Sequence, residues 1–235
     1  LKLIEFLEAK LAEAEVSSEK DSDLNADQIA DIFEQWSTGV LNSYLLEISV
    51  EVLRHKNPEG KPLVELILDK AGQKGTGLWT VMSSLELGIP APTIAQAVYA
   101  RSLSSLKALR VQASEILHGP EQLTISTQQS ALFIENLHDA LYCAKICVYS
   151  QGFQLMKQAE QEHGWHLNFA NIAKIWRAGC IIRAAFLQPI CDAYQQHQQL
   201  ENLLLDPFFI SELSSRQLNW RRAVADISLL GVPIG

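Results

Sequence analysis

The chain has 235 residues, of which 48% are hydrophobic, 20% are charged and 8% are aromatic, and its formal net charge at pH 7 is −8. A chain of this length and apolar content can bury a sizeable core in one large domain or two small ones, which excludes an intrinsically disordered protein. The acidic charge balance and the lack of any run of Lys and Arg argue against nucleic-acid binding, and no apolar stretch of about 18 residues predicts a membrane span.

The N-terminal segment, residues 1–15, has the pattern of an amphipathic helix and carries Glu5, Glu8 and Glu13 among its apolar residues. Acidic residues at these positions are wrong for a secretory signal peptide. We therefore expect an intracellular, cytoplasmic protein whose cysteines are reduced core thiols rather than disulfides. The cysteines are Cys143, Cys147, Cys180 and Cys191. The polar segment 16–23 predicts a surface loop.

Helical periodicity dominates the rest of the chain, and no alternating run of apolar and polar residues indicates a strand. Asn25 is suited to cap the first helix, and in the second helix Leu45, Ile48 and Val52 are expected to face the core. The longest helix carries an apolar stripe at spacings of three and four, namely Phe133, Leu137, Leu141, Ala144 and Val148. The predicted helices span residues 26–36, 41–53, 102–116, 127–161, 168–187 and 215–229. Together they predict a single all-α domain over residues 1–235.

The strongest candidate for a functional site is the glycine-rich segment 69–80, Asp-Lys-Ala-Gly-Gln-Lys-Gly-Thr-Gly-Leu-Trp-Thr. Three glycines within six residues let the backbone approach a ligand and present N–H groups to an anion. Lys74 adds a positive charge, Thr76 adds a hydroxyl donor, and a helix expected to begin near Leu78 would direct its positive end at the loop. The spacing matches neither a P-loop nor a dinucleotide-binding fingerprint. The segment is therefore either a phosphate or carboxylate site or a flexible turn with a solvated lysine.

Arg101 is a second candidate, because a guanidinium can bind a phosphate through two parallel hydrogen bonds. The serines around it, Ser102, Ser104 and Ser105, can equally cap and flank a helix. The residue pattern alone favours a surface arginine.

Three further patterns are weaker. His163 and His166 have a spacing that can share a metal, but Gly164 interrupts the helix and no further ligand has a fixed spacing, so we expect a helix-ending turn and no metal site. The pair Cys143 and Cys147 is expected to pack in the core. Arg177 and Arg183 either bind an anion or form ion pairs with acidic residues, and Gly179 between them suits close packing of helices.

Several blocks of this sequence occur together in one known family. The most specific is Gly-Gln-Lys-Gly-Thr-Gly at residues 72–77, within a dense block at 69–114. Supporting blocks are Ala-Lys-Ile-Cys-Val-Tyr-Ser-Gln-Gly-Phe at 144–153, Trp-Arg-Ala-Gly-Cys-Ile-Ile-Arg at 176–183, Leu-Leu-Leu-Asp-Pro-Phe-Phe at 203–209 and Trp-Arg-Arg-Ala-Val at 220–224. From about residue 26 to its end, the chain resembles the C-terminal, all-helical domain of 6-phosphogluconate dehydrogenase.

The resemblance implies an oxidative decarboxylation in the pentose phosphate pathway and gluconate utilisation. In the family, a hydride passes from C3 of 6-phosphogluconate to NADP, the resulting β-keto acid loses CO2, and the enediol tautomerises to ribulose 5-phosphate. The resemblance also implies that Lys74, Thr76 and Arg101 hold the substrate phosphate, which reverses the interpretation of Arg101 as a surface residue. A homodimer is implied as well.

Four family features are missing from this sequence. They are the helix Lys-x-x-x-Asn-x-x-Glu-Tyr that carries the general base and acid, the N-terminal Rossmann domain that binds NADP, the C-terminal tail that reaches the partner subunit, and the lysine before the Trp of the loop, which is Leu78 here. The sequence therefore contains no catalytic residue that we can name, and Leu78 removes one positive charge near the expected site.

Our leading hypothesis is a substrate-binding and dimerisation domain, cut at both ends, that is inactive on its own. One alternative is a catalytically inactive helical module for oligomerisation or interaction, derived from the same family. Another is a relative that acts on a different 3-hydroxy acid, against which the presence of Lys74, Thr76 and Arg101 counts.

Overall fold

The structure, a computed structural model, describes residues 24–120 and 127–234. The helix predicted at 1–15 and the loop predicted at 16–23 lie outside the described residues. In chain order, the helices are α2 (Ala26–Ser37), α3 (Tyr44–Arg54), α4 (Thr76–Glu86), α5 (Pro92–Ser105), α6 (Lys107–Ile116), α7 (Thr127–His163), α8 (Phe169–Trp176), α9 (Leu187–Gln196) and α10 (Pro207–Leu229), with the 3-10 turns η2 (Leu63–Leu66) and η3 (Leu203–Leu205). Over the described residues, β-type pairing is limited to two isolated bridges, Ser43 with Ala184 and Lys56 with Pro62. The predicted all-α class is confirmed.

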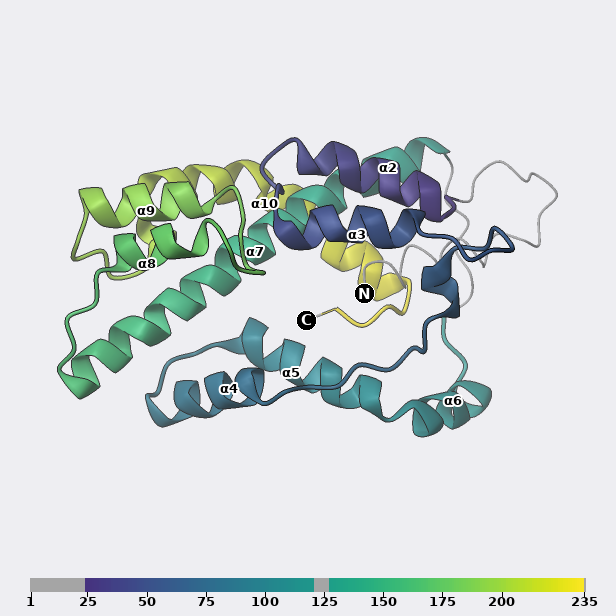
Figure 1. The fold of residues 1–235 in the computed structure, drawn as a ribbon, viewed down its shortest axis with the longest axis horizontal. Coiled ribbons are helices and arrows are strands. Elements are labelled where there is room, and N and C mark those ends of the chain that lie inside the picture. Colours follow the sequence, from purple (N-terminus) through teal and green to yellow (C-terminus); the bar gives the residue numbers. More distant parts are fainter. Residues whose placement is uncertain (1–23, 121–126, 235) are drawn as a thin grey trace.

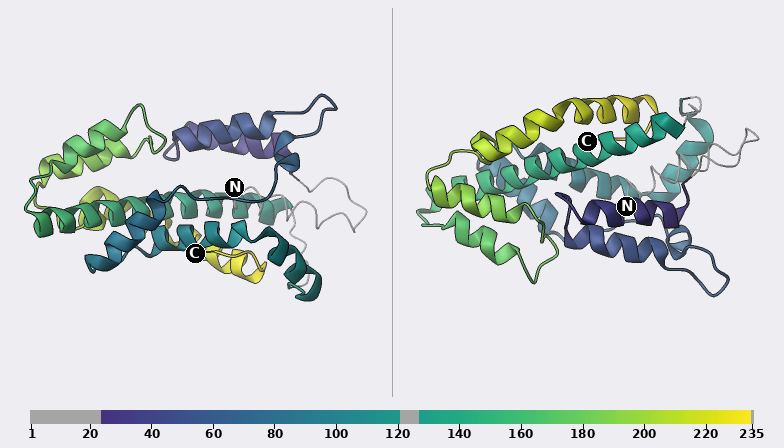
Figure 2. Two further views of the ribbon diagram at one scale, coloured as in Figure 1. Left: turned by 60° about the horizontal axis from the view of Figure 1, so that its bottom comes forward. Right: turned by 90° about the horizontal axis from the view of Figure 1, so that it is seen from above.

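Helix α7 organises the molecule. It is 37 residues long and runs beside α10, with which it makes the most extensive helix–helix contact (Figures 1 and 2). Two helical hairpins, α2–α3 and α8–α9, lie end to end along one side of α7, whereas α4, α5 and α6 form a separate row along another side (Figure 1). This arrangement divides the fold into a compact body around α7 and a helical row that carries the glycine-rich loop.

The core forms where apolar stripes of these helices meet. On α7 the fully buried side chains include Tyr142, Cys143, Ile146 and Phe153. Phe153 is the centre of an aromatic cluster with Phe169, Trp176 and Tyr194, whose ring centroids lie 5.2–6.2 Å from its own. Because each such ring removes a large apolar area from water, this cluster attaches the α8–α9 hairpin to α7.

Helix α2 begins where the sequence predicted. The Asn25 side chain accepts the backbone N–H of Gln28 at 3.0 Å, and the Gln28 side chain accepts the backbone N–H of Asn25 at 2.7 Å. This reciprocal capping box satisfies two N–H groups that the helix itself leaves without partners. Ile29 and Phe33 are buried on the inner face of α2, as expected, and Ile32 is half-buried.

The inner face predicted for the second helix was wrong. Leu46, Val50 and Leu53 are buried in α3, whereas Leu45 is 54% exposed and Val52 is 39% exposed. Both sets of residues recur with a helical spacing, so periodicity alone cannot choose between the two stripes. Packing of α3 against α2 makes the choice, because only one stripe can face that neighbour.

The helix predicted at 102–116 is two helices. Helix α5 ends at Ser105 and α6 begins at Lys107, with Leu106 between them at φ −86° and ψ 48°. The Arg110 guanidinium donates to the Ser104 carbonyl at 3.1 Å, and the Ser105 hydroxyl donates to the Ser102 carbonyl at 2.7 Å. Side-chain donors thus compete with the helical N–H groups for carbonyls at this junction.

The helix predicted at 168–187 is also interrupted, between α8 and α9. Gly179 lies in this interruption at φ +71°, a left-handed conformation that favours glycine, and a Cβ atom there would meet no atom within 4 Å. The expected role of Gly179 in close helix packing is therefore wrong, because the residue makes a turn. The turn brings Ala185 to the other hairpin, where its N–H donates to the Asn42 carbonyl at 2.9 Å.

The two remaining long helices differ from prediction at their ends. Helix α10 begins at Pro207 rather than residue 215, because Asp206 caps it by accepting the Phe208 N–H at 3.0 Å and proline suits the first helical position. Helix α7 ends at His163 rather than 161, and in it Leu141, Ala144 and Val148 are half-buried instead of forming the buried stripe.

Candidate functional site

The glycine-rich loop leads directly into α4. The helix starts at Thr76, two residues before the start expected near Leu78, because Gly75 takes a left-handed, non-helical conformation at φ +99° directly before it. A Cβ atom at Gly75 would lie 3.3 Å from the Trp79 ring, so both conformation and space favour glycine. The first helical hydrogen bond joins the Trp79 N–H to the Gly75 carbonyl at 2.9 Å.

The N-terminus of α4 is available to an anion. No side chain among the described residues caps it, and the N–H groups of Thr76, Gly77 and Leu78 have no backbone acceptor there. Unpaired N–H groups and the helix dipole give such an end a partial positive charge. Because α4 begins at Thr76, directly after the loop, its positive end lies at the loop, as the sequence analysis expected.

Two contacts place the loop against one face of α5. A Cβ atom at Gly77 would lie 3.0 Å from Cγ2 of Val98, so the start of α4 packs closely on α5 at that point. At the other end of the loop, the Ala71 N–H donates to the Ser104 hydroxyl at 3.1 Å. Arg101 lies one turn after Val98 and one turn before Ser104, and positions three residues apart share a helix face. The loop and Arg101 therefore occupy the same side of α5.

The three residues predicted from the sequence are all exposed, namely Lys74, Thr76 and Arg101. Within the described part of the chain, neither the Lys74 ammonium nor the Arg101 guanidinium has a carboxylate within salt-bridge distance or a hydrogen-bond acceptor. Leu78 follows in the first turn of α4, where its side chain is 42% exposed. The arrangement presents two cations, one hydroxyl and three N–H groups, which is a donor set for a phosphate or a carboxylate.

A charged junction next to the loop was not predicted. Asp69 accepts hydrogen bonds from Lys107 Nζ and Arg110 Nη1, each at 2.9 Å. These two cations lower the pKa of the Asp69 carboxyl to about 2, with the Arg110 hydrogen bond as the largest cause. The partners are separated by 38 and 41 residues along the chain, so no local sequence pattern could have indicated the pairing.

The weaker candidates show no site. Among the described residues, no three His, Cys, Asp or Glu side chains are grouped so that they could hold a metal. His163 packs beside Trp165, with ring centroids 4.7 Å apart, at the end of α7. Burial raises the pKa of Cys143 to about 12 and also raises that of Cys147, so both thiols stay protonated at neutral pH. All four cysteines are free; Cys143 and Cys191 are buried in the core, whereas Cys147 and Cys180 are half-buried.

The two arginines around Gly179 form contacts within the chain. Arg183 makes an ion pair with Glu47, and Arg177 donates to the Gln188 side chain. Of the alternatives left open by the sequence, the ion pair applies to Arg183. The Glu47–Arg183 pair links α3 to the segment between α8 and α9, so its role here is to join the two hairpins.

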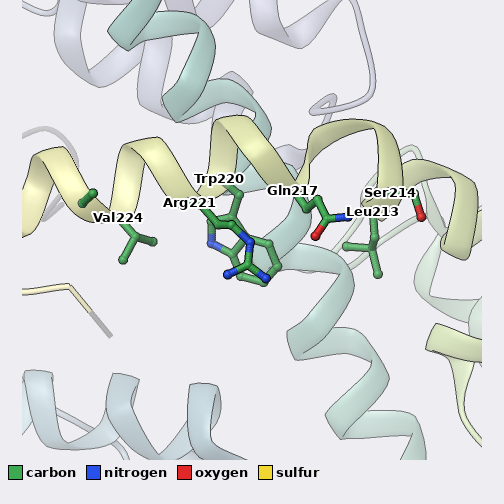
Figure 3. A pocket seen from close by; sticks show the side chains of 7 residues that line it. Leu213, Ser214, Gln217, Trp220, Arg221 and Val224 are labelled. Atoms are coloured by element: carbon green, nitrogen blue, oxygen red, sulfur yellow. The ribbon is translucent and has the colours of Figure 1, made fainter.

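The structure also contains a groove along α10 that the sequence analysis missed. Its volume is about 600 Å³, and it is lined by Leu213, Ser214, Gln217, Trp220, Arg221, Val224 and Ala225 (Figure 3). The spacing of Leu213, Trp220 and Val224 is helical and was the available signal, but the predicted helix began only at residue 215. A second, polar pocket of about 390 Å³ lies between the end of α7 and α8–α9. Neither includes the glycine-rich loop.

Comparison with known proteins identifies the family to which this fold belongs. A family model described as the C-terminal domain of 6-phosphogluconate dehydrogenase matches residues 4–235. The chain belongs to the 6-phosphogluconate dehydrogenase family and corresponds to this C-terminal domain.

Named relatives agree with this assignment. The chain is 51% identical over 211 residues to the decarboxylating 6-phosphogluconate dehydrogenase of Schizosaccharomyces pombe, covering 90% of this chain and 42% of the relative. It is 47% identical over 212 residues to the NADP(+)-dependent decarboxylating enzyme of Bacillus subtilis, covering 90% of this chain and 45% of the relative. The human enzyme is 47% identical over 208 residues, covering 88% and 43%. The chain thus spans less than half the length of these relatives.

A solved structure shows the same fold. Plasmodium falciparum 6-phosphogluconate dehydrogenase, described in its apo form and in complexes with NADP+ and with its substrate 6-phosphogluconate, superimposes with a TM-score of 0.86. The match has 38% sequence identity and covers 98% of this chain and 50% of the Plasmodium chain. No helix among the described residues is long and apolar enough to cross a membrane.

Proposed function

We propose that this chain supplies the substrate-phosphate site of an NADP-dependent, decarboxylating 6-phosphogluconate dehydrogenase, with Lys74, Thr76 and Arg101 as phosphate ligands. The observation that carries the proposal is the pair of contacts, Gly77 to Val98 and Ala71 to Ser104, that brings the loop to the Arg101 face of α5. Membership of the family and the substrate named for the Plasmodium enzyme support the choice of 6-phosphogluconate.

The chemistry of the site is electrostatic. A phosphate monoester carries up to two negative charges, and Lys74, Arg101 and the N-terminus of α4 together supply the opposite charge. Holding the phosphate fixes one end of a six-carbon substrate, so the remaining atoms are oriented for reaction without a further loss of entropy. We assign no residue of this chain to the proton transfers of the reaction.

The described residues do not fit NADP. A dinucleotide fold needs a βαβ unit, and no strand occurs within residues 24–120 or 127–234. We therefore place NADP binding outside these residues and derive no step of the reaction from nucleotide contacts here. We expect the chain alone to produce no NADPH, which a spectrophotometric assay at 340 nm would check.

Substrate binding is tested by calorimetric titration of the chain with 6-phosphogluconate. We expect binding by the wild type, and loss of about tenfold or more in affinity for Lys74→Ala and Arg101→Ala, since hydrogen bonds to charged groups contribute about 1.5–3 kcal/mol each. Lys61→Ala is the matched control, because Lys61 is also exposed but lies outside the loop. Gluconate, which lacks the phosphate, should not bind. Binding that is unaffected by both substitutions would refute the proposal.

We also propose that the chain forms a homodimer through its row of α4, α5 and α6. Helices α5 and α6 contain no buried residue, even though they carry large apolar side chains. Tyr99 on α5 is 66% exposed, and Leu109 on α6 is 57% exposed. Such exposed apolar surface is unfavourable in water unless a partner covers it. We expect sedimentation velocity to show a dimer that Tyr99→Asp dissociates. Ile175→Asp should leave the dimer intact, because Ile175 is also exposed, at 72%, but lies on α8.

A catalytically inactive helical module is the second candidate function. The exposed apolar row favours it, and so does Leu78, which stands where the family has a lysine. Such a module would dimerise but would not bind 6-phosphogluconate. The titration and the sedimentation experiment together therefore separate the two functions.

A further inference from the structure

Some cations around the glycine-rich loop pair with Asp69, and others have no carboxylate partner among the described residues. It is the sole acidic residue between Glu65 and Glu86, and it pairs with Lys107 and Arg110. Lys74 and Arg101 have no such partner within the described residues. The Asp69 carboxylate thus pairs with the two cations in the first turn of α6, whereas Lys74 and Arg101 of the proposed phosphate site have no carboxylate partner among the described residues.

The same junction ties the loop to α5 through the backbone. Arg110 Nη2 donates to the carbonyl of Asp69 at 2.6 Å and to the carbonyl of Ser104 at 3.1 Å. The Ser104 hydroxyl in turn accepts the Ala71 N–H at 3.1 Å. Arg110 therefore links the residue before the loop to the last turn of α5, and Ser104 holds the loop two residues further on.

We propose that Asp69, Ser104 and Arg110 are positioning residues that hold the loop on the Arg101 face of α5 before any ligand binds; their effect on anion binding rests on the function proposed above. Bringing Lys74 to the side of Arg101 is opposed by repulsion between like charges. The junction supplies the hydrogen bonds that oppose this repulsion. A site ordered in advance binds more tightly, because the ligand does not have to order it.

The positioning role can be distinguished from a contribution of the Asp69 ion pairs to global stability. Asp69 is 37% exposed, and ion pairs at such exposed positions contribute little to global stability. A positioning role therefore predicts a change in loop order and anion affinity with little change in the melting temperature. Simple electrostatics predicts the opposite sign for affinity, since removing a negative charge from this cluster would strengthen anion binding.

The first measurement is hydrogen exchange of the full chain without ligand, for Asp69→Asn and Ser104→Ala. We expect exchange of the Ala71 N–H, which donates to Ser104 Oγ at 3.1 Å, to accelerate by about tenfold, because local opening no longer requires breaking the junction. Asp31→Asn is the control, because Asp31 also pairs with an arginine, Arg54, at 2.7 Å but lies on α2. Ser104→Thr keeps the hydroxyl and should retain wild-type exchange. Unchanged exchange in both loop variants overturns the proposal.

The second measurement is the affinity of the same variants for 6-phosphogluconate. We expect Asp69→Asn and Ser104→Ala each to weaken binding by about tenfold, with Asp31→Asn and Ser104→Thr near the wild type. Tighter binding by Asp69→Asn, or faster loop exchange with unchanged affinity, overturns the positioning role. If the wild type binds no 6-phosphogluconate, the proposed function fails, and the exchange data alone decide whether the junction orders the loop.

Discussion

Gly77 and Val98 set the separation of α4 from α5: a Cβ atom at Gly77 would lie 3.0 Å from Cγ2 of Val98. An added Cβ atom would therefore lie closer to Val98 than an ordinary van der Waals contact between carbon atoms allows. The two helices can therefore approach this closely only because residue 77 has no side chain. Since the same approach brings the start of α4 to the Arg101 face of α5, substitution here tests packing and site geometry together.

For Gly77→Ala, we expect the free energy of unfolding to fall by about 1 kcal/mol. Overpacking of about 1–3 kcal/mol exceeds the gain in helix propensity, which is at most about 1 kcal/mol. Urea denaturation measures the change. Gly72→Ala is the control, because Gly72 has a negative φ and no atom within 4 Å of the added Cβ position. Equal stabilities of the two variants would contradict the close packing of α4 on α5.

The order of the glycine-rich loop should depend on acidic pH through Asp69. The pKa of its carboxyl is lowered from 3.8 to about 2 in the folded chain, so the ion pairs contribute fully above pH 4 and are lost as the pH falls from 4 to 2. We expect the protection of the Ala71 N–H, measured against the intrinsic exchange rate at each pH, to fall over this range in the wild type. In Asp69→Asn this protection should already be low at pH 4, and parallel protection profiles for the two proteins would rule out this account.

Lys145 should lower stability at neutral pH. It lies on α7 near the Phe186 ring, 5.5 Å from Nζ to the ring centroid, and burial lowers its pKa from 10.5 to about 8. Because the unfolded chain then holds more protons between pH 8 and 10.5, this group makes stability rise with pH across that range. Its unfavourable contribution is fully present below pH 8.

Lys145→Met tests this expectation while keeping most of the side-chain volume. At pH 7 we expect an increase of about 1–3 kcal/mol in the free energy of unfolding, since one pKa unit corresponds to about 1.4 kcal/mol. Above pH 10.5 the difference from the wild type should shrink. Urea denaturation at pH 7 and at high pH measures both values, and a variant less stable than the wild type at pH 7 would show that the buried ammonium is compensated.

Leu78→Lys should strengthen anion binding. The residue lies in the first turn of α4 beside the unpaired N–H groups, and its side chain is 42% exposed, so an added ammonium can reach the site without burial. We expect about threefold to tenfold tighter binding of 6-phosphogluconate at low salt, with the gain reduced at high salt by screening. Leu85→Lys on the same helix is the control, at 75% exposure and near the far end of α4. An equal gain in both variants would mean that net charge alone is responsible.

The sequence predicted the fold class and supplied the donor groups of the candidate site because these signals are local. The cap formed by Asn25 and Gln28 depends on residues three apart, and the glycine-rich loop and its lysine are contiguous. The resemblance named the family, which the family model and the relatives confirm. Roles for Lys74, Thr76 and Arg101 as phosphate ligands stay predictions that the titrations test.

The predictions of the buried face of α3 and of a continuous helix at 102–116 failed because the local sequence fits more than one structure equally well. The apolar stripe through Leu45 and Val52 has the same period as the stripe through Leu46 and Val50, and nothing within α3 distinguishes them. Similarly, the continuous pattern at 102–116 gave no indication of the break at Leu106, which involves a side chain four residues further on. For α3 the choice depends on α2, and at Leu106 it involves Arg110, which also bonds Asp69, 41 residues earlier in the chain. Both α2 and Asp69 lie outside the short window that periodicity examines.

The sequence by itself determined that this chain forms helices, where several begin, and that the glycine-rich loop has donors suited to an anion. These properties follow from short-range interactions: backbone hydrogen bonding, capping and the helical period. Only the tertiary structure decided that this loop contacts α5 at Val98 and Ser104, that Asp69 pairs with Lys107 and Arg110, and that α5 and α6 leave apolar residues such as Tyr99 and Leu109 exposed. These depend on contacts between residues far apart in the chain, which form only when whole helix faces pack and compete for the same apolar surface.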